Sequence, residues 1–137
     1  MSSFWTAEAS AICDNISCSS IPATAKEPMY AIDGDPATRY ASGRAQGSMG
    51  PETLTIHFGG PITISGVGIT SQNGDGAAMY KLEHSMDGAT FNAFAPPAEG
   101  TGSDAIMAAF PATTMTALRI TQTGTKPVPW WSVHEVT

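Results

Sequence analysis

The sequence contains few positive charges, no long apolar run and almost no helical periodicity. Six Lys and Arg residues stand against twelve Asp and Glu, which gives a formal net charge of −6 over 137 residues. Six scattered cations are too few to neutralise the phosphates of duplex DNA or RNA, so we expect no nucleic-acid partner. No segment approaches the roughly 18 consecutive apolar residues of a membrane-spanning helix, and a membrane partner is not expected either.

Glycine and proline are abundant, with 14 and 10 copies respectively. Inside a helix each glycine costs about 1 kcal/mol and each proline about 3 kcal/mol, relative to alanine. This composition therefore excludes a helical bundle and a coiled coil. The length suits one domain, and 42% hydrophobic residues can form its core.

Only two cysteines occur, Cys13 and Cys18. They can form a disulfide across a turn or remain two free thiols, and by themselves they cannot build a structural zinc site. The N-terminus shows no basic segment followed by an apolar run, so no signal peptide is visible. Because Val136 and Thr137 lie inside an expected strand, we expect residues 1–137 to be a single domain taken from a longer protein.

Alternation of apolar and polar residues dominates the chain after residue 50. Leu54, Ile56 and Phe58 share one side of a strand, and Gly59-Gly60-Pro61 is expected to end it. The first 50 residues show little regular pattern. Several short strands at such spacing predict an all-β sandwich. The expected strands are Leu54–Phe58, Ile62–Ile69, Met79–Ser85, Phe91–Phe94, Ala105–Met107, Leu118–Thr121 and Ser132–Val136.

Signals for catalysis are weak. The three histidines, His57, His84 and His134, stand beside no recognisable nucleophile, and no GxSxG motif occurs. We therefore expect a protein that is not an enzyme.

One loop concentrates oxygen donors. Asp33 and Asp35 flank a glycine, and the Thr38 hydroxyl follows three residues later. Calcium binds six to eight oxygens at 2.3–2.6 Å, backbone carbonyls included, so this spacing is compatible with a calcium loop. An Asp-Gly turn followed by an Asp-Pro turn, without a metal, explains the same residues.

Adjacent tryptophans precede the last expected strand. Neighbouring strand residues point to opposite sides, and Trp131 shares the parity of Val133. Trp131 is therefore expected to point into the core and Trp130 toward solvent. An exposed indole suits stacking on the C–H face of a sugar ring, although both rings could instead cover the edge of the sandwich.

Four motifs in this order resemble the discoidin, or F5/8 type C, family and especially its carbohydrate-binding branch, carbohydrate-binding module family 32. They are "AIDGDPATRYASG", "SMDGATF", "ALRIT" and "PWWSVHEV", and the resemblance covers roughly residues 28–137. It implies a discoidin-like jelly-roll β-sandwich of about eight strands. It also implies one structural Ca²⁺ that fixes the early loop to the last strand. The ligands implied by position are Asp33, Asp35, Thr38 and Glu135 with the carbonyls of Tyr30 and His134.

The function implied is a non-catalytic module that binds a polysaccharide or another glycan through loops at the rim of the sandwich. Such a module is expected to be secreted and attached to a catalytic or other domain. The usual Arg before Asn73 and an early-loop His are absent, so the sugar contacts must differ from those of galactose-binding members. The candidate sugar-binding residues are Trp130, Arg44, Gln46, Gln72 and Asn73.

Two other functions use the same fold. A discoidin domain can serve as a protein-interaction scaffold, which reduced Cys13 and Cys18 would favour. It can also bind phospholipid through apolar loop tips, although the segment from Gln72 to Ala78 is polar and acidic here.

Overall fold

The computed structural model describes residues 5–10, 28–34, 38–42, 46–47, 50–72, 74–126 and 131–137. Strands dominate these residues, and none of their helices is long and apolar enough to cross a membrane. The elements are β1 (Thr6–Ala9), η3 (Pro28–Ile32), β2 (Tyr40–Ala41), β3 (Glu52–Thr70), β4 (Met79–Ser85), β5 (Asn92–Ala93), β6 (Glu99–Thr101), β7 (Ala105–Gln122), β8 (Ser132–Val133) and β9 (Glu135–Val136).

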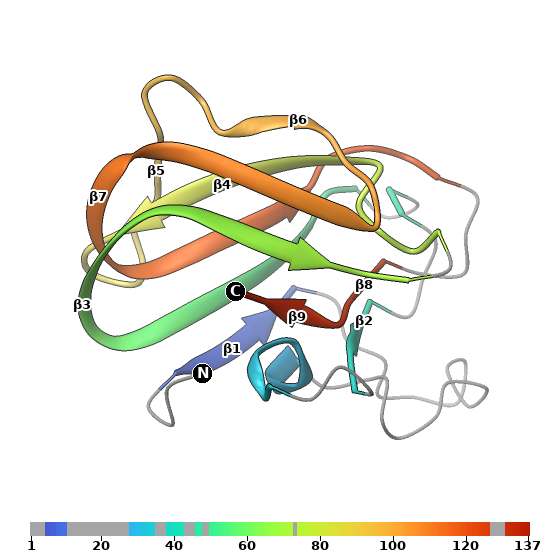
Figure 1. The fold of residues 1–137 in the computed structure, drawn as a ribbon, viewed down its shortest axis with the longest axis horizontal. Helices are drawn as coiled ribbons and strands as arrows, with labels where there is room; N and C mark the ends of the chain where they lie inside the picture. The colour runs from blue at the N-terminus through green and yellow to red at the C-terminus, as the bar shows by residue number, and fades with distance from the viewer. Residues whose placement is uncertain are drawn as a thin grey trace.

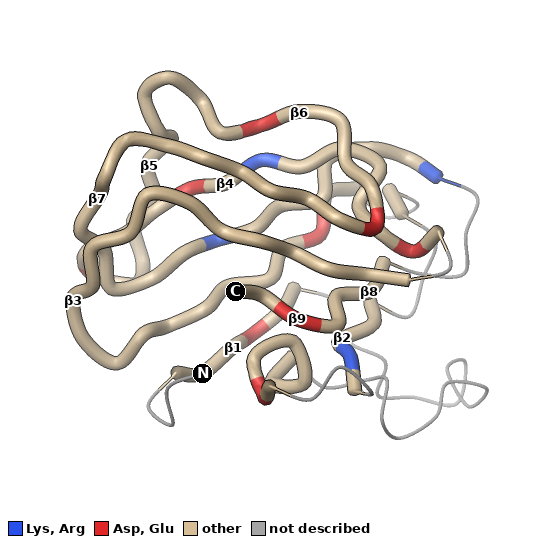
Figure 2. Tube along the Cα trace, viewed as in Figure 1, with Lys and Arg blue, Asp and Glu red and all other residues tan. Residues whose placement is uncertain are grey.

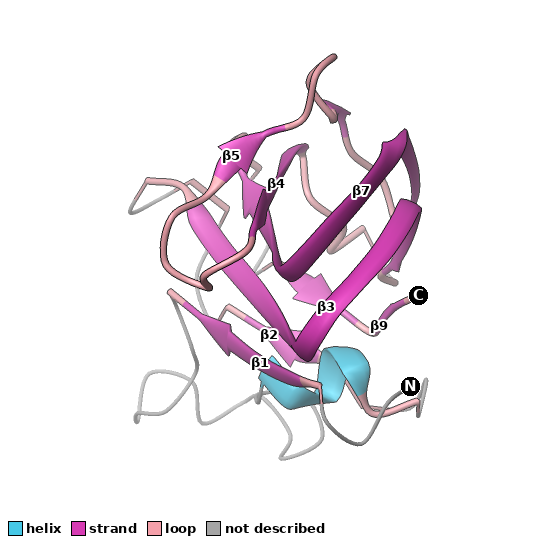
Figure 3. Ribbon diagram, turned by 90° about the vertical axis from the view of Figure 1, so that its left-hand side faces the viewer, coloured by secondary structure: helices cyan, strands magenta, loops and turns pink. Residues whose placement is uncertain are grey.

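Two long strands organise the molecule. β3 and β7 pair antiparallel along most of their length, and both bend back on themselves, one inside the other (Figures 1 and 3). The larger sheet runs in the order β1-β3-β7-β4-β5, with β6 added to β4 and β9 added to β3. Because of the bends, the two arms of this one sheet face each other and enclose the core as the two layers of a sandwich.

The core is formed by the side chains that alternate inward from both arms. Leu54, Ile56, Leu118 and Ile120 come from one arm of the β3–β7 pair, and Ile69 from the other. All five are at most 2% exposed. The alternation of apolar and polar residues therefore correctly indicated which side chains face the core, because successive strand residues point to opposite faces of a sheet.

The predicted all-β sandwich is confirmed, but two of its boundaries were wrong. Gly59-Gly60-Pro61 does not end a strand: β3 continues through it with a register shift between His57 and Ile62. The expected strands at 105–107 and 118–121 are likewise the two arms of β7. Pairing along the neighbouring strand keeps both chains extended, and irregular pairing at the bend absorbs the break.

A smaller, two-stranded sheet joins residues 40–41 to the C-terminal segment. β2 pairs with β8, Tyr40 opposite Val133, and the Tyr40 ring meets Trp131 edge to face at 5.6 Å between centroids. Trp131 is 1% exposed, as the parity with Val133 predicted. The expected strand Ser132–Val136 is divided at His134, because β8 pairs with β2 and β9 pairs with β3.

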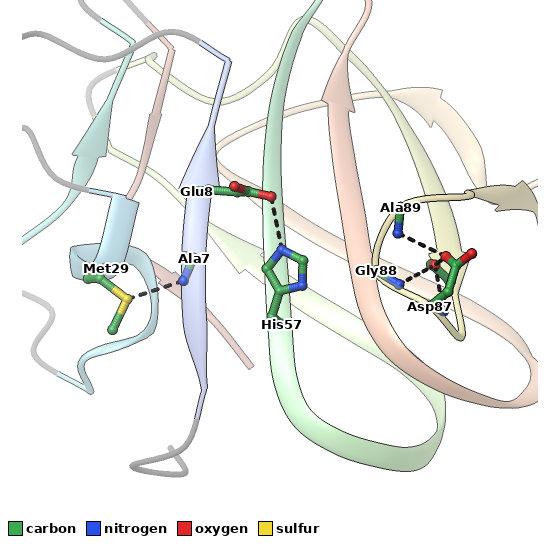
Figure 4. Close-up of polar contacts among 8 residues, drawn as sticks. Ala7, Glu8, Met29, His57, Asp87, Gly88 and Ala89 are labelled. Carbon is green, nitrogen blue, oxygen red and sulfur yellow. Dashed lines mark hydrogen bonds and ion pairs between the residues drawn. The ribbon is translucent and has the colours of Figure 1, made fainter.

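Figure 4 shows polar contacts on and around the outer side of the larger sheet. Glu8 on β1 and His57 on β3 form a cross-strand pair, Nε2 to Oε1 2.9 Å. In the turn after β4, the Asp87 carboxylate accepts a hydrogen bond from the backbone N–H of Ala89. It accepts another from the N–H of Thr90. These bonds hold the pKa of Asp87 well below its usual range, because they favour the ionised form; Thr90 contributes most, then Ala89, then the Ser85 hydroxyl.

Candidate functional site

Two carboxylates distant in sequence meet beside η3. Asp33 follows this short helix, and Glu135 lies on β9, which packs against it. Figure 2 shows that acidic residues lie on and around β9. The Thr38 hydroxyl donates a short hydrogen bond to Asp33 Oδ2. Three of the predicted calcium ligands are therefore grouped by the fold.

The electrostatics of this acid pair favour a cation. The pKa of Glu135 is raised to about 7, chiefly by burial and then by a hydrogen bond and charge repulsion from Asp33, while the Gly34 N–H opposes the rise. Glu135 Oε1 is buried and has no hydrogen-bond partner among the residues that the structure describes. An ionised carboxylate can accept hydrogen bonds but cannot donate them. A buried carboxylate oxygen that no donor reaches is therefore suited to binding a cation.

Of the other predicted ligands, two lie within the described residues. Tyr30 belongs to η3, and His134 is a buried residue immediately before Glu135. Asp35 lies outside the described residues. Within the described part of the chain, no group of three or more His, Cys, Asp or Glu side chains comes together. The described donors fit a calcium ion only together with backbone carbonyls and the Thr38 hydroxyl.

A second region of interest is the loop of residues 71–78, which joins β3 to β4. Gln46 anchors it: the side-chain amide donates to the Gly76 carbonyl at 2.9 Å and to the Asp75 carbonyl at 3.3 Å. Its Oε1 accepts from the Ala78 N–H at 2.8 Å. Gln46 is 2% exposed. Its amide is thus fully engaged with backbone and is turned away from solvent.

Asp104 supports the same loop from the other side. Its two carboxylate oxygens accept from the N–H groups of Gly74 and Gly76 at 2.9 and 2.8 Å. A Cβ at Gly76 would overlap the Ser103 carbonyl, and a Cβ at Gly102 would overlap that of Ala77. The loop of residues 71–78 and the segment of residues 102–104 therefore pack backbone against backbone, which only glycine permits at these positions.

The predicted sugar-binding residues separate into three groups. The loop of residues 71–78, held by Gln46 and Asp104, is called the braced loop below. Gln72 is exposed at its start, where the side-chain amide is accessible. The prediction that Gln46 contacts sugar was wrong, because the side chain is buried and its three hydrogen bonds to backbone make it a support for the loop. Trp130, Arg44 and Asn73 lie outside the described residues, as do Cys13 and Cys18.

Sequence reasoning missed Asp104 altogether. No local pattern marks it, because its partners Gly74 and Gly76 lie about 30 residues earlier. The segment Gly74-Asp75-Gly76 has the residues of a turn, but nothing in it indicates which acid accepts its hydrogen bonds. Together, Gln46 and Asp104 give the rim a fixed backbone that could present polar side chains to a ligand.

Comparison with known families gives one match. A family model described as the F5/8 type C domain matches residues 15–136. Among curated proteins, none matches this chain in sequence.

Solved structures with the same fold include several carbohydrate-binding modules. One is CpGH89CBM32-5 from Clostridium perfringens, in complex with GalNAc-β-1,3-galactose: TM-score 0.73, 18% identity, covering 97% of this chain and 93% of that one. A second is the family 32 module of NanJ from C. perfringens, in complex with galactose: TM-score 0.72, 22% identity, covering 98% and 92%. A third is chitosan-binding module 2, in complex with chitotriose and derived from a chitosanase/glucanase of Paenibacillus sp. IK-5: TM-score 0.68, 24% identity, covering 96% and 93%.

Proposed function

Because the chain belongs to the F5/8 type C domain family, we propose that it is a non-catalytic carbohydrate-binding module which recognises a glycan at the rim of its sandwich. The observation that carries the proposal is the fold it shares, over nearly its whole length, with modules described in complex with sugars. One of these derives from an enzyme, which supports attachment of this module to a catalytic or other domain. The proposal includes a location outside the cell, where polysaccharides are accessible.

The braced loop supplies the mechanism. Gln72 offers both a donor and acceptors to sugar hydroxyls, from a backbone that Gln46 and Asp104 hold in place. Fixing this backbone before binding reduces the entropy that the complex must lose. With Trp130 as the stacking platform and Arg44 and Asn73 as further polar contacts, a single site should bind with a Kd of about 0.1–1 mM. Repetition of sites would raise the apparent affinity.

A glycan array tests this proposal, with the wild-type chain, Gln72→Ala and Trp130→Ala side by side. We expect binding to a defined set of glycans that both variants weaken while their melting temperatures stay unchanged. If the wild-type chain binds no glycan, the function is wrong, and a protein-interaction role becomes the better explanation. If it binds but neither variant differs, the site is wrong although the function holds.

We also propose one structural calcium ion held by the acid pair. Asp33, Asp35, Thr38 and Glu135 would hold it together with the carbonyls of Tyr30 and His134. The buried Glu135 Oε1, to which no described residue donates a hydrogen bond, supports this assignment. When bound, the cation neutralises the repulsion between the carboxylates and ties the loop after η3 to β9. Its role is to stabilise the fold.

Calorimetric titration of the metal-free chain with Ca²⁺ measures this directly. Wild type should bind one equivalent, and Asp33→Asn should lose most of the affinity. At a free calcium concentration 100 times the Kd, binding adds about 2.7 kcal/mol to the stability, so excess EDTA should lower the melting temperature by several degrees. An unchanged melting temperature and no heat of binding would remove the calcium ion from the proposal.

A further inference from the structure

One edge of the larger sheet is closed by a short helix instead of a strand. β1 stands at the end of the strand order, and among the described residues no strand other than β3 pairs with it. The Ser10 N–H bonds to the Thr53 carbonyl across this pair. In an antiparallel pair, every second residue directs its N–H and C=O toward the same neighbour, so Glu8 also faces β3 and Ala7 faces away. The N–H of Ala7 therefore lies on the outer edge of the sheet.

The helix η3 lies along that edge, and a methionine closes it. η3 packs against β1 (Figure 3), and the Sδ atom of Met29 accepts the Ala7 N–H at an N···S distance of 3.1 Å (Figure 4). An unpaired N–H on an edge strand is a template for pairing with another chain, and native proteins cover such groups. Here the acceptor that covers it is a thioether, which is weaker than a backbone carbonyl.

The same side chain is accessible from solution. Met29 is 43% exposed, so an oxidant dissolved in water can reach it. Met79, Met86 and Met107 are more exposed still. Within the described part of the chain, Met29 is the one methionine whose sulfur accepts a hydrogen bond. Oxidation of Met29 therefore alters a contact between two elements, whereas oxidation of the other three alters only the surface.

A peroxide oxidises a thioether by transferring one oxygen atom. With hydrogen peroxide, a sulfur lone pair attacks one oxygen, the S–O bond forms as the O–O bond breaks, and the second oxygen leaves as water after a proton transfer. The sulfur loses two electrons, and the peroxide gains them. The product, methionine sulfoxide, is polar, and methionine sulfoxide reductases return it to the thioether.

The added oxygen does not fit the contact between Met29 and Ala7 as it stands. The oxygen takes up a lone pair of the atom that accepts the Ala7 N–H, and the nitrogen lies only 3.1 Å from the sulfur. An oxygen between the two atoms pushes η3 away from β1. An oxygen that points to solvent leaves the Ala7 N–H facing a sulfur with one lone pair fewer. In both positions the hydrogen bond that closes this edge is weakened or lost.

We propose that Met29 is a site of reversible oxidation by peroxides, and that its sulfoxide loosens η3 from the edge of β1. η3 supplies Ala31 and Ile32 to the core and ends at the residue before Asp33. Oxidation of one surface atom therefore acts on the segment that brings Asp33 to Glu135. The contact joins two parts of the chain itself, so the proposal does not rest on glycan binding or on calcium.

The test compares three proteins before and after treatment with hydrogen peroxide: the original chain, Met29→Leu, and the triple variant Met79→Leu/Met86→Leu/Met107→Leu. Leucine is close to methionine in size and has no sulfur to oxidise. Peptide mass spectrometry measures the sulfoxide at each methionine, and NMR measures hydrogen exchange of the Ala7 amide. The cysteines are the same in all three proteins, so an effect of peroxide on them cancels in the comparison.

In the original chain and in the triple variant, oxidation should speed exchange of the Ala7 amide about tenfold, the effect of one lost hydrogen bond, and lower the melting temperature. Treatment with the two methionine sulfoxide reductases, one for each epimer, should restore both values. In Met29→Leu, where the sulfur acceptor is already absent, peroxide should change neither value although the other exposed methionines are oxidised.

Three outcomes overturn the proposal. Sulfoxide at Met29 with unchanged or slower exchange of the Ala7 amide would show that the oxidised side chain closes the edge as well as the thioether does. A Met29 that stays reduced while Met107 is oxidised would show that the sulfur is inaccessible. An equal response of Met29→Leu to peroxide would assign the effect to another residue.

Discussion

Replacing Gln46 by alanine separates support of the rim loop from contact with sugar. The substitution removes three hydrogen bonds, to the carbonyls of Asp75 and Gly76 and to the N–H of Ala78. Each contributes about 0.5–1.5 kcal/mol net, so the expected loss is about 3 kcal/mol. For a domain of this size, that corresponds to a fall in melting temperature of about 10 °C.

Chemical denaturation at several urea concentrations measures the free energy of unfolding, and titration with a glycan identified on the array measures binding. Gln72→Ala is the matched control: the side chain is exposed, so its removal should change stability by less than about 0.5 kcal/mol and weaken glycan binding. Gln46→Glu keeps the acceptor for Ala78 but places a carboxylate against two carbonyls, and should destabilise at least as much as alanine. A Gln46→Ala protein with wild-type stability would refute the anchoring of the loop by Gln46. A strongly destabilised Gln72→Ala protein would refute the exposed position of Gln72.

Three further predictions concern residues away from the rim. Leu118→Ala leaves a cavity in the core and should cost about 3 kcal/mol of unfolding free energy, measured in urea. Arg119 donates from Nε and Nη2 to Glu83 Oε1, and its guanidinium lies 4.3 Å from the Phe91 ring centroid. Glu83→Ala removes the carboxylate of this half-buried pair and should lower the free energy of unfolding by about 1–2 kcal/mol. Glu83→Gln should restore only part of that loss. The pKa of Asp87 is lowered on folding, so its stabilising contribution is complete above the ordinary carboxyl pKa and is lost as the pH falls below about 4. Asp87→Asn should therefore be less stable than wild type at pH 7, with the difference narrowing toward pH 2 in thermal melts.

How much of the fold is readable from the sequence depends on the range of the interaction. Alternation located most of β3, all of β4 and the two ends of β7, because the side-chain period is a local property. It could not show that Gly59-Gly60-Pro61 is a bend within one strand, since β7 supplies the pairing that keeps this segment extended. β1 was missed for the same reason: four residues, Thr6–Ala9, become a strand only because residues 54–57 lie beside them.

The candidate sites divide in the same way. Asp33 and Thr38 are close in sequence, so their spacing alone suggested oxygen ligands. The addition of Glu135 came only from the resemblance to a family, because no local pattern connects it with Asp33. Gln46 was predicted to be a sugar-binding residue, which requires an accessible side chain. The structure buries it, because its three backbone partners come from residues 75–78, on a loop that the chain reaches much later.

The C-terminal segment connects the proposed calcium site to the proposed glycan site. The Ser132 carbonyl accepts from the Ser71 hydroxyl at 2.6 Å and its N–H donates to the Asp75 carbonyl at 3.1 Å, so Ser132 holds the start and the middle of the loop of residues 71–78. Glu135, three residues later, belongs to the acid pair, and between them the His134 N–H bonds to the Thr70 carbonyl at 2.8 Å. A cation that fixes Glu135 therefore also restrains the strand that positions the rim. Since any coupling between two binding equilibria is reciprocal, a glycan that binds more tightly in the presence of calcium must raise the affinity for calcium by the same factor.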